Sequence, residues 1–119
     1  MKRIGIVGTR QRDSEADFDL VVAAFLKVYE LGDVIISGGC LRGGDRFAAA
    51  IASKMNIPIK EYLPDWENYP RLGGFIRNTR IAGDSDILIA CIAKIRKGGT
   101  EDTINKFKRI RPDGELILI

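Results

Sequence analysis

The sequence predicts an α/β fold in which a mainly parallel sheet of about five strands carries helices on both faces. Short apolar runs recur at even intervals along the 119 residues. Several of these runs are apolar at consecutive positions, as in strands that are buried on both faces. Helical patterns fill the intervals between the runs. Alternating strands and helices imply right-handed crossovers and a doubly wound sheet.

The first half of the chain alternates in this way. A strand is predicted over Arg3–Val7, and the next over Asp33–Ser37. Between them a helix that Gly32 closes is predicted from apolar residues at helical spacing, namely Phe18, Val21, Val22, Phe25, Leu26 and Tyr29. A second helix, which leads to a strand over Pro58–Leu63, is predicted from Phe47, Ala48, Ile51, Ala52 and Met55.

The second half repeats the alternation. A weaker helical stripe precedes a strand over Asp86–Ala90 and consists of Phe75, Ile76 and Ile81. A last stripe of Ile104, Phe107 and Ile110 is stopped by Pro112 and Gly114 before a strand over Glu115–Ile119. No internal repeat or linker interrupts the pattern. We therefore expect a single Rossmann-like domain over residues 1–119.

The composition narrows the possible functions. The chain has no histidine, which excludes Ser-His and Cys-His nucleophiles and most zinc sites. We expect neither a bound metal nor a cofactor. Cys40 and Cys91 are too few for a disulfide scaffold, and Cys40 has no histidine that could activate it. No apolar run approaches the ~18 residues of a membrane span. We therefore expect a cytoplasmic protein without a membrane partner.

Ligands of open parallel sheets bind outside the carboxyl ends of the strands. The segment after the second predicted strand, SGGCLRGGDR over residues 37–46, lies at such an end. Four glycines would let the backbone of this segment turn tightly, so that its amides approach an anion at the start of the next helix; they are Gly38, Gly39, Gly43 and Gly44. Arg42 would add positive charge. Asp45 either faces the ligand or caps that helix.

Related phosphate-binding motifs do not fit. Gly39 and Gly44 have the spacing of a Walker A loop, but Asp45 and Arg46 stand where Lys and Ser or Thr belong, which excludes an ATPase. The turn after the first strand is not G-x-G-x-x-G, and no acidic residue closes the second strand, which argues against a dinucleotide-dependent dehydrogenase. The third strand ends in Tyr62-Leu63 and therefore lacks the closing Asp of a receiver domain.

Three further loops supply candidates. Gly98-Gly99-Thr100 opens the fourth predicted helix as a second anion cradle, or Thr100 simply caps it. Gly8-Thr9-Arg10 follows the first strand, where Arg10 could hold phosphate oxygens or lie in solvent. Arg77-Asn78 lies in the third helix, on a ligand-facing or an exposed side. Trp66, with Tyr69, could stack on a base or close one end of the core.

Taken in order, these motifs resemble those of the SLOG superfamily of Rossmann-like proteins, in particular its YspA-like single-domain branch. The matching pieces are Gly8-Thr9-Arg10, Gly38-Gly39-x-x-Arg42-Gly43-Gly44-Asp45-Arg46, Pro64-Asp65-Trp66, Arg77-Asn78, Asp86-x-Leu88-Ile89-Ala90 and Gly98-Gly99-Thr100. The resemblance implies a fold that binds or senses nucleotides. It implies that residues 98–100 form the second cradle and that Arg77 faces the ligand. It also implies that the phosphate and ribose side is lined by Gly38, Gly39, Arg42, Gly43, Gly44 and Asp45.

The same superfamily includes LOG phosphoribohydrolases and DprA-type DNA-processing proteins, and it therefore implies alternatives. One is hydrolysis of the N-glycosidic bond of a nucleoside 5′-monophosphate, with Asp45 or Glu101 as the carboxylate. The chain departs from the LOG pattern P-G-G-x-G-T-x-x-E, because Thr103 holds the place of the glutamate and Glu101 comes two residues earlier.

The second alternative is single-stranded nucleic-acid binding through residues 94–111, which hold seven basic and two acidic side chains. Nucleotide binding or sensing remains the leading hypothesis. A small sheet with open edges also favours a homo-oligomer.

Overall fold

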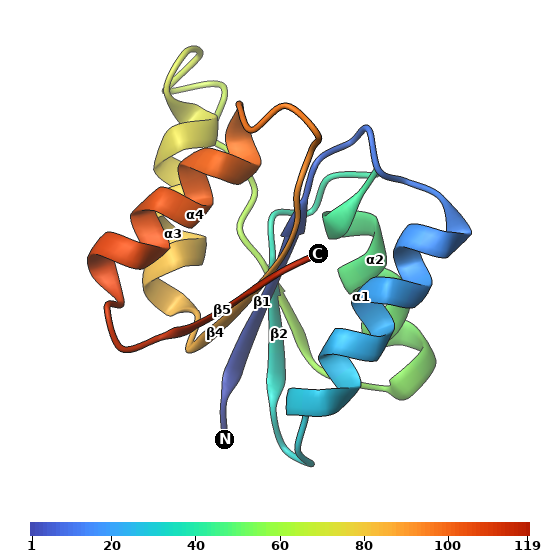
Figure 1. The fold of residues 1–119 in the computed structure, drawn as a ribbon. Coiled ribbons are helices and arrows are strands. Elements are labelled where there is room, and N and C mark those ends of the chain that lie inside the picture. The colour runs from blue at the N-terminus through green and yellow to red at the C-terminus, as the bar shows by residue number, and fades with distance from the viewer.

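A computed structural model describes all residues, 1–119, and contains a five-stranded parallel sheet in the order β3-β2-β1-β4-β5 (Figure 1). The strands are β1 (Arg3–Gly8), β2 (Val34–Ser37), β3 (Ile59–Glu61), β4 (Ile87–Cys91) and β5 (Glu115–Leu118). The helices are α1 (Glu15–Val28), α2 (Gly44–Met55), α3 (Gly73–Asp84) and α4 (Gly99–Ile110). The predicted α/β fold class and the strict alternation of its elements are confirmed.

Two helices cover each face of the sheet, α1 and α2 on one side and α3 and α4 on the other (Figure 1). The central strands contribute to both cores. On β4, Ile87 and Ile89 face α1 and α2, whereas Leu88 and Ala90 face α3 and α4. Because successive residues of a strand point to opposite faces, this double burial requires the consecutive apolar residues from which the strands were predicted.

The structure corrects the edges of the predicted elements. The strand expected over Pro58–Leu63 pairs only over Ile59–Glu61, because β3 is an edge strand with β2 as its single neighbour. Tyr29 lies one residue beyond α1 and caps its end. Several residues of the predicted stripes are exposed rather than buried, namely Leu26, Met55, Phe75 and Ile110. The apolar face of each helix is therefore wider than the part that packs against the sheet.

None of the four helices has the length and hydropathy needed to cross a bilayer.

An ion-pair network lies at the amino-terminal ends of strands β1 and β4. Asp86 accepts hydrogen bonds from the Arg3 amide at 2.8 Å and from Arg111 Nη2 at 2.6 Å. Arg3 also donates to Asp84. The hydrogen bond from the Arg3 side chain holds the pKa of Asp86 below its ordinary value of 3.8. The network therefore joins the start of the central strands to the end of α4.

Asp86→Asn is expected to lower the free energy of unfolding by about 1 kcal/mol at pH 7. Because the pKa of Asp86 is lower in the folded than in the unfolded chain, its contribution is present above pH ~4 and is lost as the pH falls through the folded pKa. The difference in stability between the variant and the wild type should therefore shrink as the pH falls below ~4. Urea unfolding at pH 7 and at pH 3 measures this. Asp113→Asn, at an exposed carboxylate without a hydrogen-bond partner, is the control, and an equal loss in both variants would contradict the role of the network.

Candidate functional site

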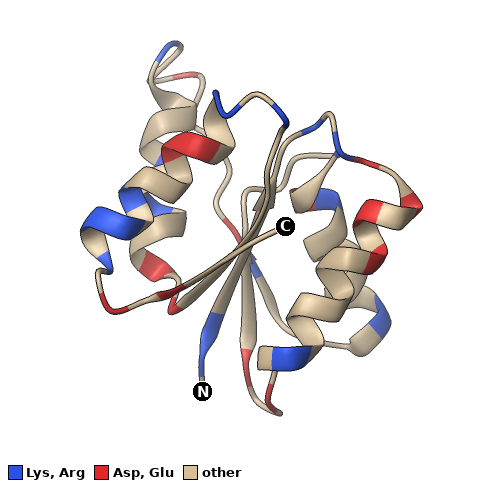
Figure 2. Ribbon diagram, in the orientation of Figure 1, with Lys and Arg blue, Asp and Glu red and all other residues tan.

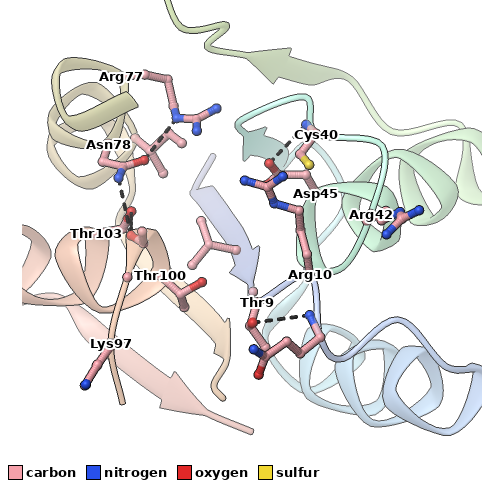
Figure 3. Close-up of a pocket in the computed structure, with 16 residues that line it drawn as sticks. Thr9, Arg10, Cys40, Arg42, Asp45, Arg77, Asn78, Lys97, Thr100 and Thr103 are labelled. Carbon is pink, nitrogen blue, oxygen red and sulfur yellow. Dashed lines mark hydrogen bonds between the residues drawn. The ribbon is translucent and has the colours of Figure 1, made fainter. Parts of the chain in front are cut away.

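A cleft of about 320 Å³ opens at the carboxyl ends of β1 and β4 (Figure 3). The strand order places the switch point of the sheet here, because the chain continues from β1 toward β2 and from β4 toward β5. The loops after these two strands therefore lead to helices on opposite faces and leave a gap between them. The cleft is lined by residues 7–11 and 97–100, and by Cys40, Arg42, Asp45, Arg77, Asn78, Ile81 and Thr103.

Most of the predicted ligand-binding residues meet in this cleft. They come from four segments that are far apart in the sequence, and they are Gly8, Thr9, Arg10, Arg42, Asp45, Arg77, Asn78, Gly98, Gly99 and Thr100. Gln11, Lys97 and Thr103 line the cleft as well and were not predicted. Lys97 directly precedes the glycine pair of the second cradle, and this adjacency was the one signal that could have identified it.

Gly38, Gly39, Gly43 and Gly44 do not line the cleft. Gly43 and Gly44 serve the packing of α2 instead. A Cβ on Gly44 would overlap the backbone of Val7 and Gly8, because α2 begins directly against the end of β1. Gly43 has φ +68°, and a Cβ there would lie 3.0 Å from the carbonyl carbon of Thr9. The glycines thus allow the start of α2 to approach the loop after β1.

The two helices that begin at the cleft have no capping side chain. α2 and α4 each begin after a glycine N-cap, Gly43 and Gly98, without a side-chain hydrogen bond to the first turn. By contrast, Ser14 and Asp17 form a capping box at the start of α1. The first amides of a helix have no intrahelical acceptor and carry partial positive charge. At α4 these amides remain available to an anion, whereas at α2 the N-cap amide of Gly43 already donates to Asp13 Oδ1 at 2.8 Å.

The Asp45 side chain stabilises the loop after β2 through hydrogen bonds. Its carboxylate accepts hydrogen bonds from the Cys40 amide at 3.0 Å, and from the Gly38 amide and Ser37 Oγ at 3.3 Å each. The alternative that Asp45 caps α2 is wrong, because the N-cap is Gly43 and Asp45 turns back from the first turn of the helix. Burial raises the pKa of Asp45 above its ordinary value, and the two amide hydrogen bonds oppose this rise only in part.

Arg77 and Asn78 of α3 link the two loops. Arg77 Nη1 donates to the Gly38 carbonyl at 2.8 Å, and its Nε donates to Asn78 Oδ1 at 3.0 Å. Asn78 Nδ2 donates onward to the Gly99 carbonyl at 3.3 Å (Figure 3). It also donates to Asp102 Oδ2 at 3.1 Å. The buried Asn78 therefore fixes the orientation of Arg77 and joins the loop after β2 to the start of α4.

Asn78→Asp is expected to lower the free energy of unfolding by about 2 kcal/mol. The substitution keeps the shape of the side chain but replaces the donor Nδ2 with an oxygen that faces the Gly99 carbonyl and the Asp102 carboxylate. Attraction to Arg77 offsets part of this loss. Urea unfolding followed by circular dichroism measures the effect. Asn105→Asp, the same change at an exposed position of α4, should leave stability within about 0.5 kcal/mol. Equal stability of both variants would argue against the bridge.

The charge around the cleft is predominantly positive. The lining holds four basic side chains, Arg10, Arg42, Arg77 and Lys97, against the single acid Asp45. None of the four forms an ion pair within the chain. Figure 2 shows basic positions on the loops at this end of the sheet. An anion in the cleft would therefore meet unpaired positive charge from both sides.

Two further candidates from the sequence lie outside the cleft. The ring of Trp66 packs on Gly73 and Gly74 at the start of α3, where a Cβ would come within 3.1 to 3.3 Å of it. Trp66 does not line the cleft, nor does Glu101, whose Oε2 accepts a hydrogen bond from Arg96 Nε at 2.7 Å. Neither side chain stands where it would contact a ligand held between the two helix starts.

Searches of protein-family models, of curated proteins and of solved structures gave no match to this chain. What the molecule has in common with known proteins is therefore its topology, a Rossmann-like α/β fold with five parallel strands in the order β3-β2-β1-β4-β5.

Proposed function

We propose that the cleft binds a phosphorylated small molecule of the nucleotide type, and that the chain is a nucleotide-binding or nucleotide-sensing domain similar to those of the SLOG superfamily. One observation carries the proposal. The uncapped start of α4 at Gly98 and the first turn of α2 at Asp45 line a cleft that also holds four basic side chains and no further acid. Helix N-termini and unpaired arginines are the groups with which proteins hold phosphate.

The size and chemistry of the lining favour a nucleotide over a free phosphate ion. A volume of about 320 Å³ lies in the range of small-molecule pockets. Gln11, Thr100 and Thr103 provide amide and hydroxyl groups for a sugar, and Val7 and Ile81 provide an apolar floor. No aromatic side chain lines the cleft, so a base would be held by polar and aliphatic contacts rather than by stacking.

Calorimetric titration tests the proposal with nucleoside 5′-monophosphates, ribose 5-phosphate, inorganic phosphate and the unphosphorylated nucleosides as separate ligands. We expect measurable affinity for at least one monophosphate, weaker binding of ribose 5-phosphate and inorganic phosphate, and no binding of the nucleosides. Mass spectrometry of small molecules released from the denatured protein would identify the natural ligand. Nucleosides that bind as tightly as their monophosphates would refute phosphate recognition.

An N-glycosidase is the second candidate, and the position of Asp45 favours it. Asp45 is the one acidic residue that lines the cleft. Cleavage of the glycosidic bond develops positive charge on the ribose, which a nearby carboxylate stabilises. Incubation with the same monophosphates should then release free base, and Asp45→Asn should abolish this release. Glu101→Gln should not, because Arg96 holds Glu101 outside the cleft. Binding without release of base in the wild type would exclude this candidate.

Nucleic-acid binding through residues 94–111 has less support. Three of its seven basic side chains form ion pairs within the chain, Arg96 with Glu101, Lys106 with Asp102 and Arg111 with Asp86. If this alternative held, affinity for single-stranded DNA would fall steeply with salt concentration.

A further inference from the structure

The four basic side chains that line the cleft differ in how the protein engages them. Arg77 is held in place, because its Nη1 donates to the Gly38 carbonyl at 2.8 Å and its Nε donates to Asn78 Oδ1 at 3.0 Å. Arg77 also lies near Asp45, since a Cβ on Gly38 would come within 2.5 Å of Arg77 Nη1 and 2.8 Å of Asp45 Oδ2. The one acid of the cleft therefore has a basic side chain of the chain close to it.

The other three basic side chains have no such partner, and they come from two sides of the cleft. Arg10 and Arg42 belong to the loops after β1 and β2, and Lys97 precedes α4. Figure 3 shows the two arginines on one side of the cleft and Lys97 on the other. None of the three forms an ion pair within the chain. A phosphomonoester carries about two negative charges at pH 7, so a monophosphate would leave one of these positive charges unmatched.

Arg42 is the residue whose charge a monophosphate leaves unmatched. A phosphate between the two sides of the cleft meets Arg10 and Lys97, whereas Arg42 is an exposed residue of the lining. Asp13 is the acid within electrostatic reach of Arg42. Its carboxylate already accepts hydrogen bonds from Arg46 Nε at 2.7 Å and from the Gly43 amide at 2.8 Å. The charge of Arg42 is therefore left to a ligand.

The backbone on both sides of Arg42 is fixed by its neighbours. Before it, the Cys40 amide donates to Asp45 Oδ2 at 3.0 Å. After it, Gly43 packs against the loop that follows β1, where an added Cβ would lie 3.2 Å from Arg10 Cα. Arg10 and Arg42 thus stand on two loops that touch each other, with a fixed backbone and a free guanidinium group. Paired guanidinium groups suit phosphate oxygens, which they bind through two parallel hydrogen bonds each.

We infer that the cleft prefers a nucleotide with two phosphoryl groups to a nucleoside 5′-monophosphate, and that Arg42 binds the second phosphoryl group. The inference rests on the proposed function, because it concerns the same cleft. A second phosphoryl group adds the negative charge that the three unpaired basic side chains lack in a monophosphate. Because Arg42 is exposed, this group does not have to fit inside the volume of about 320 Å³. It follows the first phosphoryl group directly in a 5′-diphosphate, and it lies across the sugar in a 3′,5′-bisphosphate.

Calorimetric titration of the full chain with three ligands of one base tests the preference. They are the nucleoside 5′-monophosphate, the 5′-diphosphate and the 3′,5′-bisphosphate, in buffer without divalent cations. We expect the 5′-diphosphate or the 3′,5′-bisphosphate to bind about tenfold more tightly than the monophosphate. The tighter of these two ligands then shows where on the nucleotide the second group lies. Monophosphate binding that neither of them exceeds would overturn the inference and leave the proposed function standing. No binding of any of the three ligands would refute the proposed function and the inference together.

Arg42→Ala tests the role of the residue. This variant should lose the preference and keep the monophosphate affinity of the wild type, because Arg42 has no partner in the protein that the change would disturb. Arg71→Ala is the control, since it removes the same charge from an exposed residue that does not line the cleft. It should keep the preference. An unchanged preference in Arg42→Ala, or an equal loss in Arg71→Ala, would refute the role of Arg42.

Arg42→Lys separates the charge from the shape of the guanidinium group. Lysine keeps the positive charge but cannot form two parallel hydrogen bonds to a phosphoryl group, so this variant should retain only part of the preference. Loss of monophosphate binding in Arg42→Ala or Arg42→Lys, with the fold intact by circular dichroism, would place Arg42 on the first phosphoryl group and overturn the inference.

Discussion

Gly44→Ala is expected to lower the free energy of unfolding by about 3 kcal/mol or more. The added Cβ would lie 2.5 Å from the carbonyl oxygen of Val7 and would overlap the backbone of Val7 and Gly8. These atoms belong to β1, which pairs with a strand on each side and cannot move without breaking those pairs. Urea unfolding measures the loss of stability. The affinity for a phosphorylated ligand should fall as well, because α2 would be displaced.

Gly83→Ala is the matched control. Gly83 lies inside α3, and a Cβ there would meet only Ile110 Cγ2, at 3.9 Å. Alanine should therefore stabilise the protein by about 0.5–1 kcal/mol, because it restricts the unfolded chain and favours the helix. The two substitutions have identical chemistry and expected effects of opposite sign. Wild-type stability of Gly44→Ala would show that α2 does not begin against β1.

Removing two basic side chains from the cleft, in the double variant Arg10→Ala with Lys97→Ala, is expected to weaken binding of a nucleoside monophosphate about a hundredfold. Arg10 follows β1 and Lys97 precedes α4, so the two charges reach the cleft from opposite sides. A hydrogen bond to a charged group contributes about 1.5 kcal/mol or more, which is roughly tenfold in affinity for each residue. Stability should change little, because neither side chain has a partner in the protein.

The control for this variant is Lys108→Ala with Arg109→Ala, at two exposed residues in the last turn of α4. It removes the same charge from the opposite end of that helix, so any general effect of net charge appears equally in both proteins. Calorimetric titration at fixed ionic strength compares them. Similar losses of affinity in the two variants would mean that the ligand is attracted by overall charge and not held in the cleft.

The order of strands and helices could be predicted because burial requires apolar residues at regular positions in the sequence. β4 is covered on both faces, so all five of its residues are buried and its sequence is an uninterrupted apolar run. The edges were less predictable. β3 has one neighbour, and the pattern that suggested six residues, Pro58–Leu63, forms only three paired ones. An edge strand ends where its partner ends, and local composition does not record that position.

The place of the cleft followed from the predicted topology, but the roles within it did not. The four glycines before α2 suggested direct contact with a ligand, and the structure uses Gly43 and Gly44 to bring α2 against β1. Trp66 suggested a stacking platform, yet its ring packs on the start of α3. A glycine that makes room for a ligand and one that makes room for another strand look the same in the sequence.

Local pattern therefore determines which segments become strands or helices and which loops meet at the switch point, because each depends on burial repeated over neighbouring residues. Contacts between distant segments are decided only when the chain folds. Arg77 meets the Gly38 carbonyl across 39 positions of sequence, and Asn78 meets the start of α4 across 21. These bonds depend on the packing of α3 against α4 and on the loops that this packing brings together, which no single stretch of residues encodes.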